Sequence, residues 1–555
     1  MFMDSAGPAA NSENPGMTTR TVTGADRLAQ RLAAAGIRHA YGIPGGEVLA
    51  FVEAIQQAGI EPVLVKHENS AGFMAEGTWH ATGAPGLFYA TLGPGVANAI
   101  NVVANAFQDR VPLIFVTGCV DQAEAESYTH QVFDHQALLR PIVKASFRAT
   151  ADTADLVADK AITIALSGRP GPVHIDLPIS VAEGPARPGP LTITVAPAPQ
   201  APAGSASLNA ARDALARAQR PLIIAGLDVV NQGASAAVAA LADSLDAPLI
   251  TTYKAKGVID ETTPRALGGA GLSPKADKLL MPLIQAADVI VLAGYDPIEM
   301  RIGWRHPFAA DTVLIDVCAE AMTHGMHHAT HLFVGDIAAS LDVLGRELTP
   351  RSSWANKEPA GVRQALVTAF LPEEGWGPAR AFTTLRDVAP RDTIVTVDSG
   401  AHRILASQVW SCFTPRTMLQ STALCTMGCA VPLALGYKLA SRQAPVLAFV
   451  GDAGLEMVLG ELATARDRSL GVVIAVLVDE SLALIEMKQR ATQRPNMAVD
   501  FGASDFPAIA AALGGHGVWI DDAATLASEA RAAFDRSTFT VLAIRIGRRA
   551  YEGKF

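Results

Sequence analysis

Short apolar runs alternate with helical patterns from one end of this chain to the other, and this alternation restricts the fold more than any other property of the sequence. Strand-length runs are Pro62–Lys66, Leu87–Thr91, Pro112–Thr117, Thr393–Val397, Val446–Val450 and Val472–Val478. A strand that is apolar throughout is buried on both faces, so helices must cover both sides of its sheet. The sequence therefore predicts an α/β fold of doubly wound parallel sheets.

The chain has 555 residues, which is too many for one hydrophobic core and indicates about three domains. Residues 186–206 and 349–376 are rich in proline or charge, carry little strand pattern, and are expected to be linkers. They divide the chain into domains 19–185, 207–348 and 377–555. The first and third of these have similar patterns, as after an old duplication.

Residues 1–18 are polar and have no apolar h-region, so we expect a disordered tail rather than a signal peptide, with translation starting at Met1 or Met17. The formal charge is −10 and no run of Lys or Arg stands out, which argues against nucleic-acid binding. The longest apolar runs have strand length, so no membrane span is expected. Five cysteines without CxxC spacing indicate neither a disulfide framework nor a zinc site and favour the cytoplasm.

A glycine-containing turn follows the apolar run that ends at Val450. Its sequence is Gly451-Asp452-Ala453-Gly454, and a helical pattern continues from it to about Arg468. Free backbone N–H groups at such a turn suit a diphosphate, and a carboxylate there can hold the accompanying Mg²⁺. By itself the pattern is more often an ordinary turn.

The next strand strengthens the functional interpretation. It ends at Asp479, and a strand–turn–helix–strand path brings the ends of neighbouring parallel strands to one edge of the sheet. Asp452 and Asp479 would then lie side by side. Two carboxylates and a diphosphate form an oxygen-rich site of the kind that Mg²⁺ prefers.

The segment Gly451–Asp479 resembles the motif of thiamine-diphosphate-dependent enzymes that begins Gly-Asp-Gly and ends Asn-Asn. The resemblance implies that Asp452 and Asp479 bind Mg²⁺ together with the backbone carbonyl of Ser481, and that the turn Gly451–Gly454 binds the cofactor. The chain departs from the motif at Ala453, which replaces a glycine, and at Val478-Asp479, which replaces Asn-Asn. We expect metal binding to survive both changes.

Two further segments resemble cofactor-binding parts of the same family. In Ser421–Gly436, Met427 matches the residue that supports the bent cofactor, and the Cys425 carbonyl would accept a hydrogen bond from the aminopyrimidine. In the helical run Leu482–Arg490, Ile485 would pack on the cofactor. A lone Met is usually core filler, but the surrounding match favours the cofactor role for Met427.

The first part of the chain resembles the acetolactate synthase group within this family, over Gly42–Phe51, Lys66–Gly77 and Gly93–Gly118. The resemblance implies that Glu68 bonds the pyrimidine N1′ and promotes loss of the thiazolium C2 proton. It also implies that Gly45 and Gly46 line the pocket and that Gln131 points at the reacting carbon, although His130 replaces the usual Phe. Without the resemblance, Glu68 would be an ordinary acidic residue at a helix start.

The middle part has strand–glycine-turn patterns, and in acetolactate synthases this domain holds FAD. The turn Gly294–Arg301 lacks the family's paired Asp and has Arg301 displaced by one position, so FAD and a purely structural domain both stay open. Lys488 stands where acetohydroxyacid synthases have a Trp that selects 2-ketobutyrate. Arg301 and Lys488 are candidate substrate residues, and Lys488 could hold an anion or be a solvated helix lysine.

The resemblance covers nearly the whole chain and implies a thiamine-diphosphate-dependent enzyme. In the family the cofactor attacks a 2-oxo acid, CO₂ leaves, and the remaining group joins an acceptor or a proton. We expect acetolactate-synthase-like carboligation from pyruvate, in a homodimer or homotetramer whose sites lie between subunits. The alternatives are a decarboxylase or lyase for another 2-oxo acid or an acyl-CoA, and a non-catalytic regulatory homologue. The sequence identifies neither the acceptor nor a small regulatory subunit.

Overall fold

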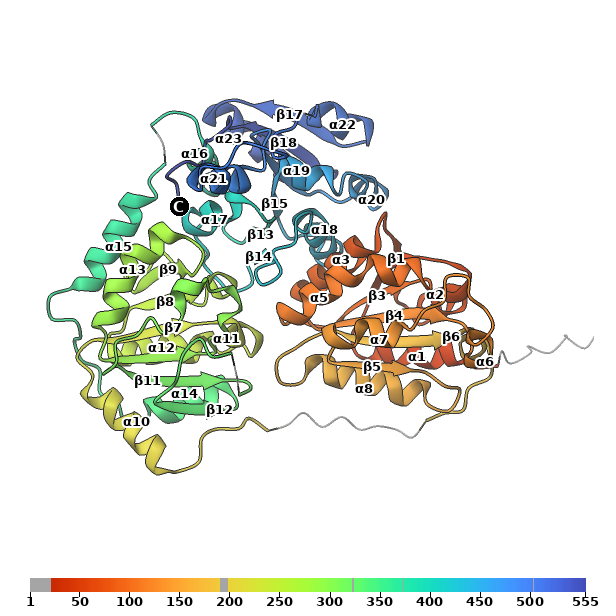
Figure 1. The fold of residues 1–555 in the computed structure, drawn as a ribbon, viewed down its shortest axis with the longest axis horizontal. Coiled ribbons are helices and arrows are strands. Elements are labelled where there is room, and N and C mark those ends of the chain that lie inside the picture. The colour runs from red at the N-terminus through yellow and green to blue at the C-terminus, as the bar shows by residue number, and fades with distance from the viewer. Residues whose placement is uncertain (1–20, 190–197, 322–323, 373, 503) are drawn as a thin grey trace, which may run out of the picture.

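The computed structural model describes residues 21–189, 198–321, 324–372, 374–502 and 504–555. These residues form three parallel sheets of six strands each, with helices between them (Figure 1). The α/β fold of doubly wound parallel sheets is therefore confirmed. The expected tail 1–18, and residues 190–197 of the expected linker 186–206, lie outside the described residues.

The first sheet has the strand order β2-β1-β3-β4-β6-β5. Its strands are β1 (His39–Ile43), β2 (Glu61–Leu64), β3 (Gly86–Ala90), β4 (Leu113–Cys119), β5 (Ala145–Arg148) and β6 (Val173–Pro178). The helices are α1 (Gly24–Ala34), η1 (Gly46–Val48), α2 (Leu49–Gln57), α3 (Glu68–Thr82), α4 (Pro94–Asn98), α5 (Ile100–Gln108), α6 (Gln122–Ala125), α7 (His135–Leu139), η2 (Arg140–Ile142), α8 (Ala154–Leu166) and α9 (Ile179–Glu183). Strands β3, β4 and β6 are buried along their whole length, since α1, α2 and α8 cover one face and α3 and α5 the other.

The third sheet has the order β14-β13-β15-β16-β18-β17, which is the order of the first sheet when each is numbered from its own first strand. Its strands are β13 (Ile394–Val397), β14 (Met418–Gln420), β15 (Val446–Gly451), β16 (Val473–Val478), β17 (His516–Ile520) and β18 (Thr540–Arg545). The helices are α16 (Pro378–Val388), α17 (Ala401–Val409), α18 (Ala430–Ala440), α19 (Asp452–Glu456), α20 (Glu461–Asp467), α21 (Ala483–Ala491), α22 (Phe506–Ala512) and α23 (Ala523–Phe534). The two sheets thus share one architecture.

The middle sheet has the order β12-β11-β10-β7-β8-β9. Its strands are β7 (Pro221–Ala225), β8 (Leu249–Thr252), β9 (Ala266–Ala270), β10 (Val289–Ala293), β11 (Val313–Cys318) and β12 (His331–Val334). The helices are α10 (Ala206–Arg217), α11 (Leu227–Asn231), α12 (Ser235–Leu245), η3 (Tyr253–Ala255), α13 (Pro274–Ala286), η4 (Pro297–Glu299), η5 (Ile302–Trp304), α14 (Ile337–Gly345) and α15 (Glu358–Ala369). This order is typical of dinucleotide-binding domains and reverses direction between β7 and β10.

Helix α3 of the first domain packs on helix α18 of the third at very short range. A Cβ on Gly77 would lie 2.2 Å from the carbonyl oxygen of Leu433, and one on Gly436 would lie 2.0 Å from that of Met74. The Thr78 hydroxyl donates a hydrogen bond to the Gly436 carbonyl across this contact (3.3 Å). Glycine is required on both helices because their backbones touch.

A buried ionic group joins all three sheets. The Lys254 ammonium of η3 donates to Asp109 Oδ2 at 2.9 Å, and both side chains are almost completely buried. The same carboxylate accepts the N–H groups of Thr422 (3.0 Å) and Ala423 (2.9 Å) from the third domain. Asp109 therefore fixes the segment that leads to Cys425 and Met427.

Two local expectations need correction or detail. The helix expected to run from the Gly451–Gly454 turn to about Arg468 is interrupted, because α19 ends at Glu456 and α20 begins only at Glu461. The stretch 349–376, expected to be a linker, contains α15, which contributes Leu366 to the core of the middle domain. The domain boundaries themselves stay predictions.

No helix in the described ranges combines the length and apolarity that a bilayer crossing requires.

Candidate active site

Asp452 and Asp479 lie together at the carboxyl edge of the third sheet. Strands β15 and β16 are parallel neighbours, so the residues that follow them meet at one edge. The N–H groups of Asp479 and Glu480 donate to Asp452 Oδ2 at 3.1 and 2.7 Å, and the Ala453 N–H donates to Oδ1 at 2.9 Å. The carboxylate of Asp452 is thus held by backbone groups from both strand ends.

The two carboxyl groups are buried next to each other, which disfavours their ionisation. Burial and, next in size, the neighbouring carboxylate of Asp452 together raise the pKa of Asp479 to about 8. Burial also raises the pKa of Asp452. A divalent cation would remove this penalty, and carboxylate oxygens are the ligands that Mg²⁺ prefers. Ser481 lies beside the pair, and its hydroxyl already donates to Asp500 Oδ1 (2.8 Å).

A cavity of about 390 Å³ opens at this edge. It brings together all the candidate site residues that were predicted from the sequence in the second half of the chain. These are Arg301, Cys425, Met427, Gly451, Asp452, Ala453, Gly454, Asp479, Ser481, Ile485 and Lys488. Arg301 comes from the middle domain and the others from the third, so the cavity lies where these two domains meet.

A third strand end, which the sequence reasoning missed, completes the cavity wall. Residues 399–404 follow β13 and line the cavity at the start of α17. The buried carboxylate of Asp398 accepts the N–H groups of Gly428 (3.0 Å) and Cys429 (2.9 Å), which ties this turn to the segment with Met427. A Cβ on Gly454 would lie 2.1 Å from Asp398 Oδ2, so only glycine fits there. The signal in the sequence was a strand followed by Asp-Ser-Gly and a helix.

Three buried polar atoms of residues 399–404 have no hydrogen-bond partner within the described part of the chain. They are Ser399 Oγ, His402 Nε2 and Arg403 Nε, on side chains that line the cavity. Burial lowers the pKa of His402 to about 3, with Arg403 acting in the same direction, so its imidazole is neutral. Buried polar atoms without partners are costly unless a ligand meets them. Together with the carboxylate pair they fit a diphosphate and its divalent cation.

Ala453 and Cys425, both in the cavity wall, differ in backbone conformation. Ala453 lies inside α19 and is absent from the residues with positive φ, so its backbone is helical and the methyl group causes no strain. Cys425 has φ +57°, a left-handed conformation that favours glycine. Its sulfur accepts a hydrogen bond from Arg403 Nη2 (3.2 Å), which fixes the side chain beside the cavity.

Glu68 lies elsewhere in the single chain. It is the first residue of α3, is only 6% exposed, and its Oε2 accepts a hydrogen bond from Asn98 Nδ2 (3.0 Å). Its neighbours His67 and Asn69 line a second hollow with Cys425 and Met427. Among the described residues, those that line the main cavity come only from the middle and third domains.

The other residues predicted in the first domain are also outside the main cavity. Gln131 is exposed, has φ +60°, and belongs to a largely exposed loop. Gly45 packs against Thr91, where a Cβ would lie 2.2 Å from Oγ1, whereas Gly46 is open to solvent. Within one chain, therefore, the predicted residues of the first domain do not line the cavity that contains Asp452 and Asp479.

A middle domain with this strand order would bind a dinucleotide at the switch point between β7 and β10. There the turns after the two strands touch, since the Asp228 N–H donates to the Gly294 carbonyl (3.1 Å) and a Cβ on Gly226 would lie 2.5 Å from the same oxygen. The buried carboxylates of Asp228 and Asp296 occupy the edge and pair with Arg169 at 2.8 and 3.4 Å. Arg110 also pairs with Asp296 (3.0 Å), so a diphosphate here would have to break these ion pairs, and this edge does not fit FAD.

Comparisons with known proteins match three family models in chain order. They are the thiamine pyrophosphate (thiamine diphosphate) enzyme N-terminal TPP binding domain over residues 22–138, the central domain over 208–344, and the C-terminal TPP binding domain over 398–544. The chain is 32% identical to the acetolactate synthase isozyme 1 large subunit of Escherichia coli (strain K12), over 85% of this chain and 84% of the relative. It is 29% identical to the catabolic acetolactate synthase of Raoultella terrigena, over 94% and 95%. It is also 29% identical to the acetolactate synthase large subunit of Parasynechococcus marenigrum (strain WH8102), over 95% and 88%.

Proposed function

The chain belongs to the thiamine pyrophosphate enzymes and has acetolactate synthases among its relatives, and on this premise we propose that it decarboxylates a 2-oxo acid, with pyruvate favoured, and joins the remaining two-carbon unit to an acceptor. It is a thiamine-diphosphate-dependent enzyme. One observation carries the proposal of a working site: the buried pair Asp452 and Asp479 shares a cavity with the unpartnered Ser399 hydroxyl and the unpartnered Nε2 of His402.

Each group of the cavity has a proposed role. Asp452, Asp479 and the carbonyl of Ser481 hold Mg²⁺, and the Ser399 hydroxyl donates to the diphosphate beside the turn Gly451–Gly454. Met427 and Ile485 pack against the cofactor, and the Cys425 carbonyl accepts from its aminopyrimidine. When bound, the cofactor supplies the electron sink for decarboxylation.

Glu68 is the proposed proton carrier at the pyrimidine N1′. Its carboxyl is buried and held by Asn98, so its position is fixed before any ligand arrives. Gln131 is the proposed neighbour of the reacting carbon. Arg301 and Lys488 line the cavity as cations, which suits the carboxylate of a 2-oxo acid.

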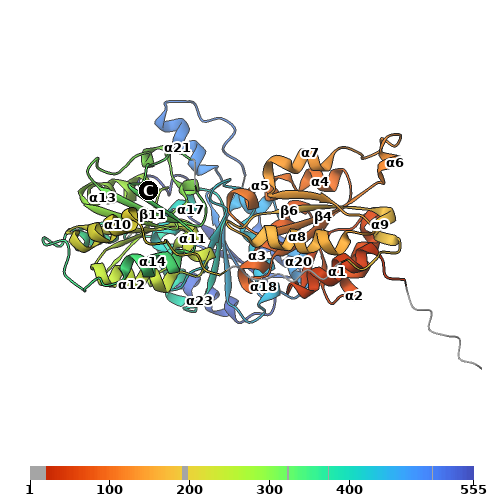
Figure 2. The same cartoon turned by 90° about the horizontal axis from the view of Figure 1, so that it is seen from below.

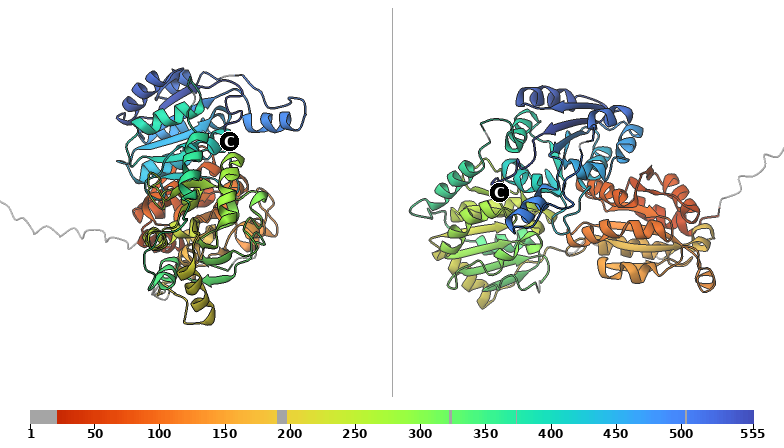
Figure 3. Two further views of the ribbon diagram at one scale, coloured as in Figure 1. Left: turned by 90° about the vertical axis from the view of Figure 1, so that its left-hand side faces the viewer. Right: turned by 45° about the horizontal axis from the view of Figure 1, so that its top comes forward.

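We propose that the site is completed by a second copy of the chain, in a homodimer or homotetramer. The side of the molecule that carries α21 also carries α4, α6 and α7 of the first domain (Figure 2). Helix α21 extends outward from the third domain in two views (Figures 2 and 3). Exposed apolar side chains lie on both parts, with Tyr128 and Phe133 in the first domain and Ile485 in α21. A second copy covering this side would bring Glu68 toward Asp452.

Subunit mixing tests this arrangement. Glu68→Gln and Asp452→Asn should each be inactive alone, and the two variants unfolded and refolded together should recover about a quarter of wild-type activity, because half of random dimers carry one intact site of two. Each variant refolded by itself is the control. A mixture that stays as inactive as its components refutes the shared site.

Product analysis tests the reaction. With pyruvate as the sole substrate and added cofactor and Mg²⁺, the wild type should form acetolactate, which acidification converts to acetoin. A 2-oxo acid with a second anionic group, or an acyl-CoA, is the second candidate substrate, and Lys488 in the cavity wall is the observation that favours it. Turnover of such a compound in place of pyruvate would select that candidate. Equal rates for wild type and Glu68→Gln would contradict the mechanism altogether.

Two further expectations concern the protein's surroundings. A cytoplasmic location is proposed because all five cysteines are free thiols in the described structure. Several relatives are named as large subunits, so purification of the tagged chain from its source, followed by identification of co-eluting small proteins, would test for a small regulatory subunit.

A further inference from the structure

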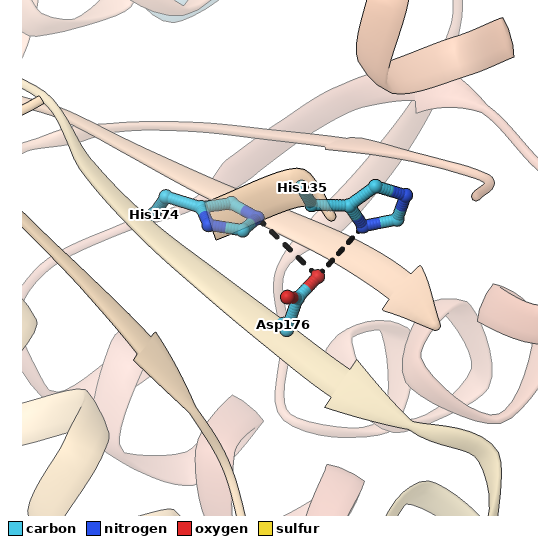
Figure 4. Close-up of side chains that lie close together, drawn as sticks. All are labelled: His135, His174 and Asp176. Atoms are coloured by element: carbon cyan, nitrogen blue, oxygen red, sulfur yellow. Dashed lines mark hydrogen bonds and ion pairs between the residues drawn. The ribbon is translucent and has the colours of Figure 1, made fainter. Parts of the chain in front are cut away.

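A buried polar cluster lies in the first domain at the ends of β4 and β6 and the start of α7. Asp176 of β6 is bonded by His135 of α7, whose Nδ1 is 2.8 Å from Asp176 Oδ1 (Figure 4). His174 of β6 points at the same oxygen from 3.5 Å (Figure 4). The Thr117 hydroxyl of β4 lies 2.7 Å from that oxygen and 2.8 Å from His174 Nε2. The three titratable side chains are at most 4% exposed.

The hydrogen-bond directions in this cluster follow from its outer partners. The backbone N–H of Gly93 donates to His135 Nε2 (3.3 Å), so His135 carries its proton on Nδ1 and donates it to Asp176. The Thr117 hydroxyl donates to Asp176 and therefore accepts from His174 Nε2–H. Both imidazoles are thus neutral: His135 donates its Nδ1–H to Asp176, and His174 donates its Nε2–H to Thr117.

Metal binding is the alternative role for this cluster, since two histidines and a carboxylate place ligand atoms within 4.8 Å of one another. Each of those atoms already has a hydrogen-bond partner, and none of them is among the unpartnered buried atoms of the described chain. A bound ion would have to break these bonds. The cluster is better explained as a hydrogen-bonded support.

The supported element is the turn at Gly93. Gly93 has φ +65°, and a Cβ there would lie 2.4 Å from the Gln131 carbonyl oxygen, so the turn rests directly on the Gln131 loop. Helix α4 starts immediately after it. Two residues of α4 meet the Glu68 carboxyl: Asn98 donates to Oε2 at 3.0 Å, and the Cβ position of Gly95 lies 3.4 Å from Oε1.

We propose that His135, oriented by Asp176, is a positioning residue that holds the Gly93 turn and thereby aligns both Glu68 and Gln131. The inference rests on the proposed function, because it assigns these two groups to catalysis. His135 touches neither substrate nor cofactor and acts only through the backbone N–H of Gly93. Thr117 and His174 restrain Asp176 from the other side.

Two substitutions of His135 separate its two hydrogen bonds. His135→Asn keeps a donor near the Nδ1 position for Asp176 but removes the acceptor for Gly93. His135→Gln keeps an acceptor near the Nε2 position but removes the donor for Asp176. We expect kcat to fall by about tenfold to a hundredfold in the Asn variant, the range that a small misplacement of catalytic groups produces, and to stay within a few-fold of wild type in the Gln variant. KM for the 2-oxo acid should change little in either.

His174→Gln is the matched control, because it alters the same cluster without touching Gly93. It should lower the melting temperature about as much as His135→Asn while leaving kcat near the wild-type value. Thiamine diphosphate binding, measured by calorimetry with Mg²⁺, should be unchanged in all three variants. Should His135→Asn fail to fold, the nearly isosteric Asp176→Asn serves instead, with a loss of several-fold in kcat expected from the weaker acceptor.

Three results would overturn the inference. The first is an unchanged kcat in His135→Asn, and the second is a loss of kcat that follows the loss of stability in every variant, His174→Gln included. The third is a stoichiometric metal ion that is bound by the wild type and is lost when His135 is replaced. Failure of the proposed function is a separate outcome. In that case wild type and Glu68→Gln would already be indistinguishable in turnover, before any change at His135.

Discussion

Replacing Asp479 by asparagine tests the charge balance at the proposed metal site. In the cofactor-free chain, burial and the carboxylate of Asp452 raise the pKa of Asp479 from 3.8 to about 8. The folded state therefore holds this proton more tightly than the unfolded state. The resulting contribution to stability is complete below about pH 4 and is lost as the pH rises through about 8.

The size of the effect follows from this difference. Between about pH 5.5 and 8 the unfolded carboxyl is already ionised, whereas the folded one loses its proton only near the upper end of the range. One pH unit corresponds to about 1.4 kcal/mol, so the free energy of unfolding should fall by roughly 3 kcal/mol across this interval. Asp479→Asn has no proton to lose here and should show a nearly flat profile. Mg²⁺ with thiamine diphosphate should flatten the wild-type profile too, because a cation stabilises the ionised pair.

The assay is thermal unfolding of cofactor-stripped protein in buffers of increasing pH, for the wild type, Asp479→Asn and Glu480→Gln. Glu480→Gln is the control. It removes a carboxylate at the next residue of the chain, whose side chain is 42% exposed. We expect the melting temperature to fall with rising pH in the wild type and in Glu480→Gln but not in Asp479→Asn. A fall of equal steepness in all three proteins would refute the argument that the buried pair dominates this titration.

Four other outcomes follow from the geometry. Lys254→Met leaves the carboxylate of Asp109 buried without its cation, so urea unfolding should show a loss of about 3–5 kcal/mol. Gly454→Ala places a methyl group against Asp398 Oδ2 and should weaken thiamine diphosphate binding in calorimetry, whereas Gly361→Ala, in open space on α15, should not. Lys488→Met should raise KM for an anionic 2-oxo acid several-fold with little change in kcat. The purified protein should show no flavin absorbance, because carboxylates occupy the middle domain's switch point; a stoichiometric flavin would contradict that reasoning.

The sequence alone determined the class of fold and half of the candidate site. The strand runs were readable because a buried parallel strand must be apolar on both faces, whatever surrounds it. Asp452 and Asp479 were readable as a pair for a related reason. They follow consecutive strands in a strand–turn–helix–strand unit, and such local connectivity fixes which strand ends become neighbours.

Tertiary structure decided what depended on contacts between distant segments. Ser399 and His402 join the cavity because β13 lies beside β15 in the sheet although some fifty residues separate them in the chain, and no local pattern encodes that order. The support of Gly93 by His135 depends on Asp176, which comes from another strand. The separation of Glu68 from the carboxylate pair within one chain was implied only by the family resemblance, and it depends on where the closely packed helices α3 and α18 hold the first and third domains. Local periodicity reports burial and turns, whereas the meeting of remote side chains is set by the packing of whole domains.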